Sequence, residues 1–471
     1  MKKINVIIGL CIGAATLCGC SDSLLDVNPN MQNTTNNFFK SAEQLEQGVN
    51  AAYSTLQLNG QYEISNLLLG ELPSDNTWDE VPANDGGDCG QLDEFSMTSG
   101  NTVTENSWRD NYIGIQQCNV VLNRVGNVPG LTDDKKNTTI GEMKFLRGLM
   151  YFNLVRIFGD VPLVTQETSN VNDYFGQGRT ASEEVYKQIK ADLTEASSLL
   201  PEKESQRGRA NKWAALGILA KVELTLKDYQ AAQSHLQEIV NANRYMLLDD
   251  PAQIFSPHNK GNKEIIFDVQ FESGMNGNTE GSDAFRYFSP SGTVNGAKGH
   301  NLPTKEVYDL FADNDLRKNA YIKQTTGNLA SGKFVQTSDV IEDGGNNVVV
   351  LRYADVLLML SECLANNGQL EEACHYLNLI KRRAGISTFV SNVQSEVLDE
   401  IALERRKELV NEGSRWFDLI RTGKAVEVMN NYFKSTVGYN GISITEDNLV
   451  QPIPQSQIDT DSSILQNKNY N

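Results

Sequence analysis

The sequence predicts a mostly α-helical protein in which tetratricopeptide-type helix pairs are separated by long irregular loops. Helical periodicity recurs in several long stretches, and one helix–turn–helix segment occurs twice. Segments rich in glycine, asparagine and aspartate lie between the helical stretches. A length of 471 residues would suggest about three domains, but no low-complexity linker divides the chain. We therefore expect a single folded domain over residues 37–471.

Four helices are expected before the repeated segment. Ser41 is placed to cap the first of them, because its side chain can accept a hydrogen bond from the first helical turn. Gly159 is placed to end the third, since glycine readily adopts the backbone conformation that terminates helices. The expected ranges are 39–57, 104–125, 139–158 and 183–200.

An internal repeat supports the helix-pair prediction. Residues 219–240 align without a gap over residues 360–381, and each segment reads as a helix, a short turn and a second helix. Tetratricopeptide units bury their apolar faces only by stacking, and about three are needed for a stable array. Degenerate copies are therefore assigned to the 139–158 and 183–200 helices, which gives helix pairs over about 139–245 and 352–384.

The N-terminus has the features of an export signal. A basic start (MKK) precedes an apolar run that is too short to span a bilayer. The LCGC sequence that follows, ending at Cys20, resembles a bacterial lipobox; the alternative is an ordinary cleaved signal with a free thiol. We expect residues 1–19 to be a lipoprotein signal peptide, Cys20 to carry the lipid, and residues 20–36 to form a tether.

The composition excludes several classes of partner. With 41 basic and 60 acidic residues, the net charge is -19, so the surface should repel nucleic acid and anionic lipid. No apolar run after residue 20 is long enough to cross a membrane, which leaves the lipid anchor as the expected membrane contact. Four later cysteines are too few for a disulfide framework. We expect Cys118, Cys363 and Cys374 to pack between helices. Disulfide bridges between Cys89 and Cys118 and between Cys363 and Cys374 are left open.

No motif in the sequence indicates catalysis. The four histidines have no recognisable metal-ligand spacing, and nucleophile-elbow and phosphate-loop motifs are absent from the sequence. A glycosidase needs only two carboxylates, which so acidic a chain cannot exclude. Asp313 and Asp315 lack calcium-loop spacing, so a turn or helix-end role is expected, with bound calcium left open. We assign no catalytic residue, cofactor or metal ligand.

Two loop-rich segments, residues 70–100 and 272–302, hold the candidate ligand site. In the first, Trp78 lies among carboxylate and amide side chains, a combination that suits a sugar: the ring covers an apolar sugar face while polar groups bind hydroxyls. The alternative is that Trp78 only fixes its loop to the helical body. The second carries six glycines around an aromatic cluster. The expected ligand-binding residues are Asp75, Asn76, Trp78, Asp79, Phe285, Arg286, Tyr287 and Phe288.

A row of glutamates near the C-terminus predicts buried ion pairs. Glu400, Glu404 and Glu408 are spaced at i, i+4, which is repulsive on an isolated helix. Such a row requires cations from other elements. We expect Arg147 and Arg156 of the 139–158 helix to be among them.

Five segments, taken together, resemble the SusD/RagB family of nutrient-binding lipoproteins, and the resemblance runs from the lipobox to the last residues. Ser361-Glu362-Cys363 departs from the common Ala-Glu-Ala type sequence, which changes packing only. The segments are MKFLRGLMYFNLVRIFGDVPLV, LRYADVLLMLSECL, LNLIKRRAGI, ALERRKELVNEGSRWFDLIRTGK and NLVQPIPQSQIDTDSSILQNKNY.

This resemblance implies a SusD-like fold: mostly α, with tetratricopeptide-type helix pairs wrapped by long irregular loops with a few short strands. It also implies a lipid-anchored protein exposed on the outer membrane of a Gram-negative cell. Such a protein captures oligosaccharides without catalysis and delivers them to a partner SusC-like TonB-dependent transporter. Capture of oligopeptides by the same architecture is the alternative.

Overall fold

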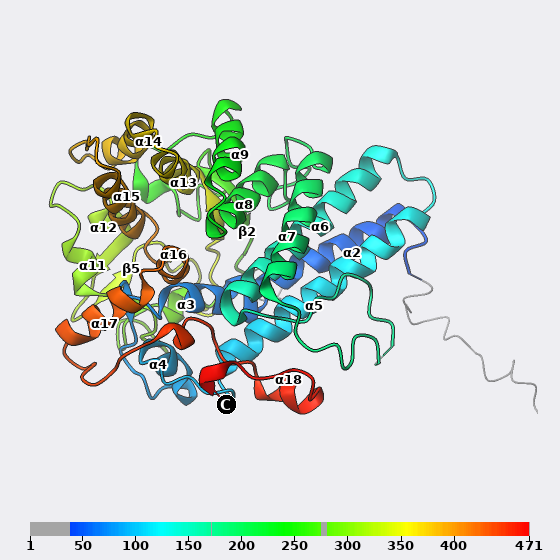
Figure 1. The fold of residues 1–471 in the computed structure, drawn as a ribbon, viewed down its shortest axis with the longest axis horizontal. Coiled ribbons are helices and arrows are strands. Elements are labelled where there is room, and N and C mark those ends of the chain that lie inside the picture. The colour runs from blue at the N-terminus through cyan, green and yellow to red at the C-terminus, as the bar shows by residue number, and fades with distance from the viewer. Residues whose placement is uncertain (1–37, 171, 275–279, 471) are drawn as a thin grey trace, which may run out of the picture.

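The fold of the chain is mostly helical, with loops and short strands gathered against one side of a helical layer (Figure 1). The structure is a computed structural model and describes residues 38–170, 172–274 and 280–470. The expected signal peptide, the lipid-carrying Cys20 and the tether lie outside the described residues. Within the described residues, we find no helix with the length and apolarity needed to span a membrane.

The N-terminal part of the helical layer surrounds the long helix α6. Ser41 caps the first helix by accepting a hydrogen bond from the Gln44 amide at 3.3 Å, and Gly159, with φ of 72°, ends α6. Helix α6 is buried on most of its surface because α2, α5 and α7 all pack against it. These helices are α2 (Ala42–Ser54), α5 (Thr102–Arg124), α6 (Asp133–Phe158) and α7 (Ser182–Leu199).

The two copies of the repeat form helix pairs with the same turn. The pairs are α8 (Lys212–Thr225) with α9 (Tyr229–Asn241), and α13 (Tyr353–Asn366) with α14 (Leu370–Arg383). In each turn the middle residue has a positive φ: 62° at Lys227 and 81° at Gly368. The following amide then donates to a carbonyl five residues back in both copies. Helix α9 packs directly on α13, so the pairs stack as their apolar faces require.

Short strands and helices lie between and after the long helices, some of them in the expected loop segments 70–100 and 272–302. Three two-stranded antiparallel sheets occur in the described residues: β1 (Thr77–Trp78) with β3 (Leu302–Pro303), β2 (Ile265–Val269) with β6 (Val348–Arg352), and β4 (Ile322–Gln324) with β5 (Leu329–Ser331). The short helices are α3 (Ser65–Glu71), α4 (Asp88–Asp93), α10 (Ala284–Tyr287), α11 (Lys305–Asp309) and α12 (Lys318–Tyr321). The C-terminal helices are α15 (Gln394–Glu408), α16 (Arg415–Arg421), α17 (Ala425–Ser435) and α18 (Gln455–Thr460).

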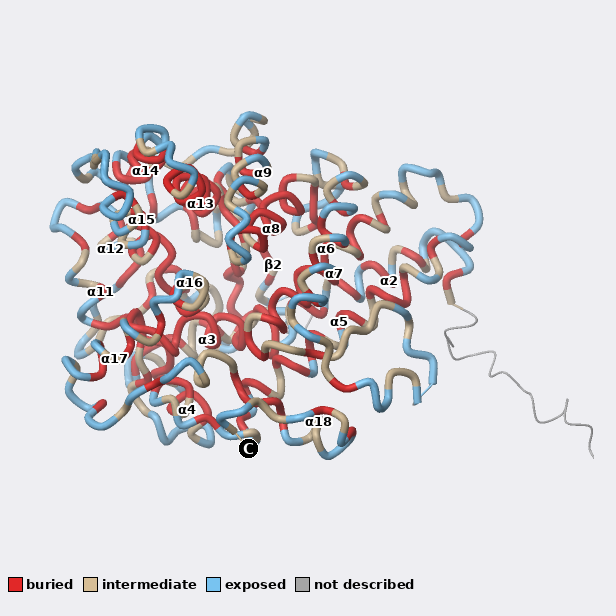
Figure 2. Tube along the Cα trace, in the orientation of Figure 1, coloured by how far each residue is buried: buried red, intermediate tan, exposed pale blue. Residues whose placement is uncertain are grey.

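Single helical turns complete the described structure. Buried residues follow the helices of the layer and continue into the loops that pack on it, whereas the outer turns are exposed (Figure 2). The 3₁₀ turns are Thr55–Gln57, Asp85–Gly87, Val125–Asn127, Pro251–Gln253, Glu446–Asn448 and Lys468–Tyr470, and a π turn covers Asn59–Glu63.

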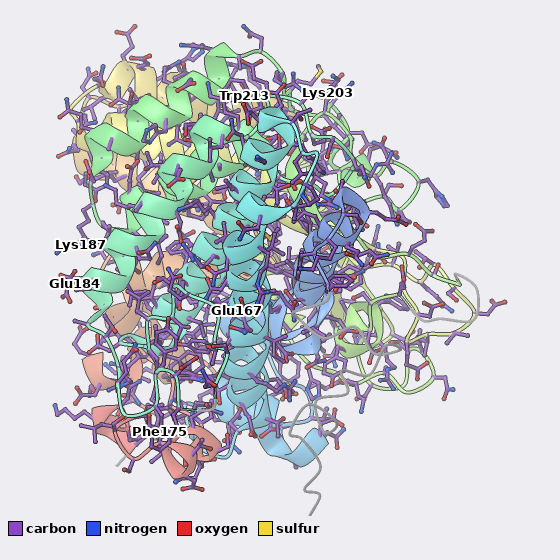
Figure 3. All side chains as sticks on the ribbon, turned by 90° about the vertical axis from the view of Figure 1, so that its right-hand side faces the viewer. Glu167, Phe175, Glu184, Lys187, Lys203 and Trp213 are labelled. Atoms are coloured by element: carbon purple, nitrogen blue, oxygen red, sulfur yellow. The ribbon has the colours of Figure 1, made fainter. Side chains whose placement is uncertain are left out.

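Figure 3 views the molecule from the side of α6 and α7. Glu184 and Lys187 project from the first turns of α7 and form an exposed ion pair at 2.6 Å. Phe175, in the connection between α6 and α7, is 60% exposed. Trp213, at the start of α8, is buried among the helices, which is a packing role.

The described cysteines form no disulfide. Cys89, Cys118, Cys363 and Cys374 are all free and buried, so both possible bridges left open by the sequence are excluded. Cys118, Cys363 and Cys374 lie in α5, α13 and α14, where they act as small apolar residues in helix packing.

The predicted partners of the glutamate row are wrong. Arg147 instead pairs with Asp192 of α7 at 2.8 Å, and the Arg156 guanidinium lies between the rings of Phe152 and Phe417. Arg147 therefore points toward α7 and Arg156 toward Phe417 of α16, and in the described residues neither forms an ion pair with the glutamate row.

The cations that bind the row come from other segments. Glu408, fully buried at the end of α15, is surrounded by Arg317, Arg352 and Arg383, with the first two at 2.7 Å. Glu400 pairs with Lys381 at 2.6 Å. The need for outside cations is therefore confirmed, although the arginines precede α12, end β6 and end α14.

The two aspartates considered for calcium have structural partners. Asp315 is buried and pairs with Arg317 at 2.8 Å, which places it in the same ion cluster. Asp313 is exposed and pairs with Lys318 at 2.8 Å. These contacts fit the expected turn role.

Candidate ligand-binding groove

An open groove of about 700 Å³ lies beside β1, and we call it the Trp78 groove. Its walls come from α11, from the turn between β4 and β5, and from the end of α17 with the loop that follows. Four aromatic residues line it: Trp78 and Tyr308 are half-buried, whereas Tyr432 and Tyr439 are buried in the wall. The groove therefore joins segments that are far apart in the sequence.

Strand pairing sets the orientation of Trp78. In the β1–β3 ladder, Trp78 stands opposite Leu302 and Thr77 opposite Pro303. Successive side chains of a strand point to opposite faces. Thr77 and Asp79 are accordingly buried, while Trp78 is half-buried and presents part of its ring to the groove.

The polar residues before Trp78 are bound within the protein. Asp75 is buried and pairs with Arg415 at 2.8 Å and with Arg406 at 3.0 Å. Burial raises the pKa of Asp75, but the two guanidiniums outweigh this effect and hold it below its usual value. Asn76 donates to Glu71 at 2.9 Å and accepts from Arg406 at 2.9 Å. These side chains fix the loop that precedes β1.

Asp79, on the other side of Trp78, is also buried. Its Oδ1 accepts from the Val81 amide at 3.0 Å and lies 3.0 Å from Nδ1 of His300. The three polar neighbours that the sequence placed around a sugar thus lie behind Trp78 and support its strand. The structure brings polar groups to the groove from other segments.

Sequence reasoning missed three of the four rings. Tyr308 is on α11, where its hydroxyl accepts a hydrogen bond from Gln324 at 2.6 Å. Tyr432 and Tyr439 lie at the end of α17 and in the following loop, with ring centroids 5.6 Å apart. Val437, at the rim, is 95% exposed. Their separation from Trp78 along the chain left no local pattern that could have grouped them.

The second aromatic cluster is packed instead of open. Residues 284–287 form α10, and Phe288 is 2% exposed with its ring against Phe334. Tyr287 is half-buried and tilts against His300, with centroids 5.6 Å apart. Arg286 pairs with Asp283 and with Glu342. Among the described residues that line the Trp78 groove, none belongs to 285–288.

A buried carboxyl group connects the groove wall to β1. Oδ2 of Asp93 accepts a hydrogen bond from the Tyr439 hydroxyl at 2.7 Å and from the Asp79 amide at 3.0 Å. Burial raises the pKa of Asp93 from 3.8 to about 8. The folded protein therefore binds a proton at the Asp93 carboxyl group more tightly than the unfolded chain does.

This shift gives a prediction for Asp93→Asn. Because the folded-state pKa is raised, the contribution of Asp93 to stability is complete below pH 3.8 and is lost as the pH rises to about 8. The variant lacks this loss, so its free energy of unfolding should improve relative to the wild type between those pH values. Urea unfolding at several pH values measures the difference. Asp399→Asn, at an exposed site on α15, is the control, and a difference independent of pH would contradict the prediction.

The fold and the groove define a class: a helical-repeat protein whose packed loops form an open groove with aromatic residues in its lining. Residues 317–470 match the model described as SusD family, and residues 23–224 match a model described as "Starch-binding associating with outer membrane". The chain belongs to the SusD/RagB family.

Individual relatives resemble the chain along most of its length. SusD-like protein P38 of Formosa agariphila is 26% identical in an alignment that covers 96% of this chain and 96% of that protein. The starch-binding protein SusD of Bacteroides thetaiotaomicron is 24% identical and covers 85% of this chain and 84% of its own length. The solved structure of a laminarin-binding SusD-like protein is 28% identical, with a TM-score of 0.78 over 92% of this chain and 100% of that chain.

Proposed function

We infer that this protein binds oligosaccharides in the Trp78 groove, on the surface of the outer membrane, and passes them to a SusC-like TonB-dependent transporter. The observation that carries the inference is an open groove with the half-buried rings of Trp78 and Tyr308 on its surface and the buried Tyr432 and Tyr439 in its wall. Rings of this kind cover the apolar faces of sugar residues, and open grooves admit chains longer than a single sugar.

The polar groups of the groove suit an uncharged glycan. The charged pair Lys305 and Asp309 is internally neutralised, because its ammonium and carboxylate groups form an ion pair with each other. Gln324 and Thr325 add amide and hydroxyl groups that can donate and accept hydrogen bonds. A neutral polyol would satisfy such groups without leaving a charge unpaired.

The relatives support the same ligand class. One of them is a laminarin-binding protein and another a starch-binding protein, and both of these ligands are polysaccharides. We propose binding without catalysis for this chain. Asp75, Asn76 and Asp79 would act by holding Trp78 in place, and the packed 285–288 segment would support the loop next to it.

The expected lipid anchor would make moderate affinity sufficient. Cys20 and the tether of residues 20–36 would hold the protein beside the transporter, and tethering raises the effective concentration of the bound sugar at the transporter mouth. Mass spectrometry of the mature chain, with and without a Cys20→Ala change, tests the attachment.

Trp78→Ala is expected to weaken glycan binding at least about tenfold, because a central aromatic contact contributes well over 1 kcal/mol to binding. Isothermal titration with a panel that includes laminarin and starch oligosaccharides measures the loss, and a panel of oligopeptides tests the alternative ligand class.

Phe175→Ala is the matched control for that titration. It removes an exposed ring from the connection between α6 and α7, outside the groove, and should leave affinity unchanged. Equal affinity of Trp78→Ala and wild type would exclude Trp78 from the site, and binding of peptides alone would replace the glycan proposal.

A further inference from the structure

A buried group of potential metal ligands lies directly behind Trp78. It consists of Asp79, which follows Trp78 in the chain, Cys89 on α4, and His300, which precedes β3. All three residues are buried. We propose that Asp79, Cys89 and His300 bind one zinc ion, which fastens β1, α4 and β3 together beneath the groove.

The three candidate ligand atoms are close enough together to bind one zinc ion after small movements. A carboxylate oxygen of Asp79, the Cys89 sulfur and a ring nitrogen of His300 lie within 4.8 Å of one another. Zinc bonds to oxygen, nitrogen and sulfur are about 2.0–2.3 Å long, so small side-chain rotations bring the three atoms around one ion. The mixture of thiolate, imidazole and carboxylate favours zinc over calcium or magnesium, which prefer oxygen ligands alone.

The second nitrogen of His300 has the partner that metal-binding histidines use. Nδ1 faces Asp79, whereas Nε2 lies 2.9 Å from a carboxylate oxygen of Asp85. Lys298 holds the other Asp85 oxygen at 2.7 Å. A carboxylate on the far nitrogen fixes the orientation of the ring, so that Nδ1 can bind the metal once the proton between it and Asp79 has left.

A further polar atom in the cluster has no partner. Oδ2 of Asp79 is buried and accepts no hydrogen bond from the described residues. A buried carboxylate oxygen without a partner is costly. A zinc ion beside it would remove that cost and would also balance the charges, since one carboxylate and one thiolate neutralise the divalent ion. Binding would release the thiol proton of Cys89 and the proton between His300 and Asp79.

The ion would act on the position of Trp78 and on stability. Asp79 and His300 flank the short β1–β3 ladder, which has only two pairs of residues. Linking its two strands through a metal would fix the strand that carries Trp78. The proposal concerns the support of this strand and does not depend on which ligand the groove binds.

The test uses the untagged full chain, treated with chelator and then titrated with zinc chloride. One equivalent of zinc should bind, with about two protons released, as measured by calorimetry in buffers of different ionisation enthalpy. Cobalt in place of zinc should give a near-ultraviolet thiolate charge-transfer band. Zinc should also raise the melting temperature.

Two variants and one control make the test specific. Cys89→Ser should remove the cobalt band and weaken zinc binding at least about tenfold, whereas Cys374→Ser, at another buried cysteine, should change neither. Asp85→Asn changes a more exposed residue and should weaken zinc binding about 10–100-fold through the histidine. This variant keeps the test decisive if Cys89→Ser fails to fold.

The proposal is overturned if the chelated protein takes up no zinc. It is also overturned if the cobalt spectrum lacks a thiolate band, or if Asp85→Asn and Cys374→Ser bind zinc equally well. Loss of glycan binding in a variant that still binds zinc would leave it intact, so the two functions are tested separately.

Discussion

Glu408→Gln is expected to lower the free energy of unfolding by about 3–5 kcal/mol, because removing one member of a buried ion cluster leaves the others without compensation. Glutamine keeps the size of the side chain and can still accept hydrogen bonds, so the loss reports the charge itself. Burial tends to raise the pKa of Glu408, but Arg383, Arg352 and Arg317 hold it well below the usual value. The carboxylate is therefore charged in the folded protein at neutral pH.

The cluster around Glu408 joins four separate segments. Arg317 precedes α12 and also pairs with Glu404 at 2.5 Å. Arg352, at the end of β6, binds Glu264 at 2.9 Å and Glu412 at 2.7 Å. With Glu408 neutral, both guanidiniums would lose a charged partner, and both are almost fully buried. The expected loss of stability therefore comes from contacts that join the repeat helices to the loops.

Urea denaturation followed by circular dichroism measures this effect. Glu427→Gln is the matched control, because Glu427 is exposed on α17 and its pair with Lys424 contributes at most about 1 kcal/mol. A loss below about 1 kcal/mol in Glu408→Gln would mean that the remaining acids compensate the arginines, contrary to the prediction.

This cluster also shows what the sequence could predict. The i, i+4 spacing of Glu404 and Glu408 predicted that cations from other segments would pair with them. This prediction needs only the local sequence, and it is confirmed. The identity of the cations depends on tertiary packing. Arg317 and Arg352 lie at the short elements α12 and β6, which have no helical periodicity to mark them in the sequence. The choice of Arg147 and Arg156 from a long, regular helix was therefore wrong.

The groove shows the same contrast between features that a local sequence pattern predicts and features that depend on tertiary packing. The gapless repeat gave the stacked pairs α8–α9 and α13–α14, because identical helix–turn–helix patterns must bury equivalent faces. Trp78 could be singled out by its polar neighbours, yet those neighbours are buried behind it. The tyrosines of α11, of α17 and of the loop after α17 reach the groove only through tertiary packing, which no periodic signal in the sequence indicates.

Gly70→Ala is expected to destabilise the protein by about 3 kcal/mol or more, at the upper end of the cost of overpacking a core. A Cβ atom at Gly70 would lie 1.9 Å from the carbonyl oxygen of Gly413 and 2.5 Å from its carbonyl carbon. Both atoms belong to the backbone and cannot move aside as a flexible side chain could. Helix α3 and the turn after α15 would therefore have to separate.

That separation would break hydrogen bonds as well as contacts. Glu71, the last residue of α3, accepts from the amides of Asn411 and Ser414, both at 3.1 Å, and from Asn76 at 2.9 Å. The turn has little freedom to adjust, because Gly413 itself has φ of 70° and lies against the backbone of α3. The strain would thus reach the loop that carries Trp78.

Gly126→Ala separates this steric effect from the general effect of replacing a glycine. A Cβ at Gly126 meets no heavy atom within 4 Å, so this control should change stability by less than about 1 kcal/mol. Thermal and urea unfolding of both variants measure the contrast, and glycan titration of Gly70→Ala below its melting temperature measures its effect on the groove. Equal stability of the two variants would show that α3 and the turn can move apart at little cost, which their direct backbone contact argues against.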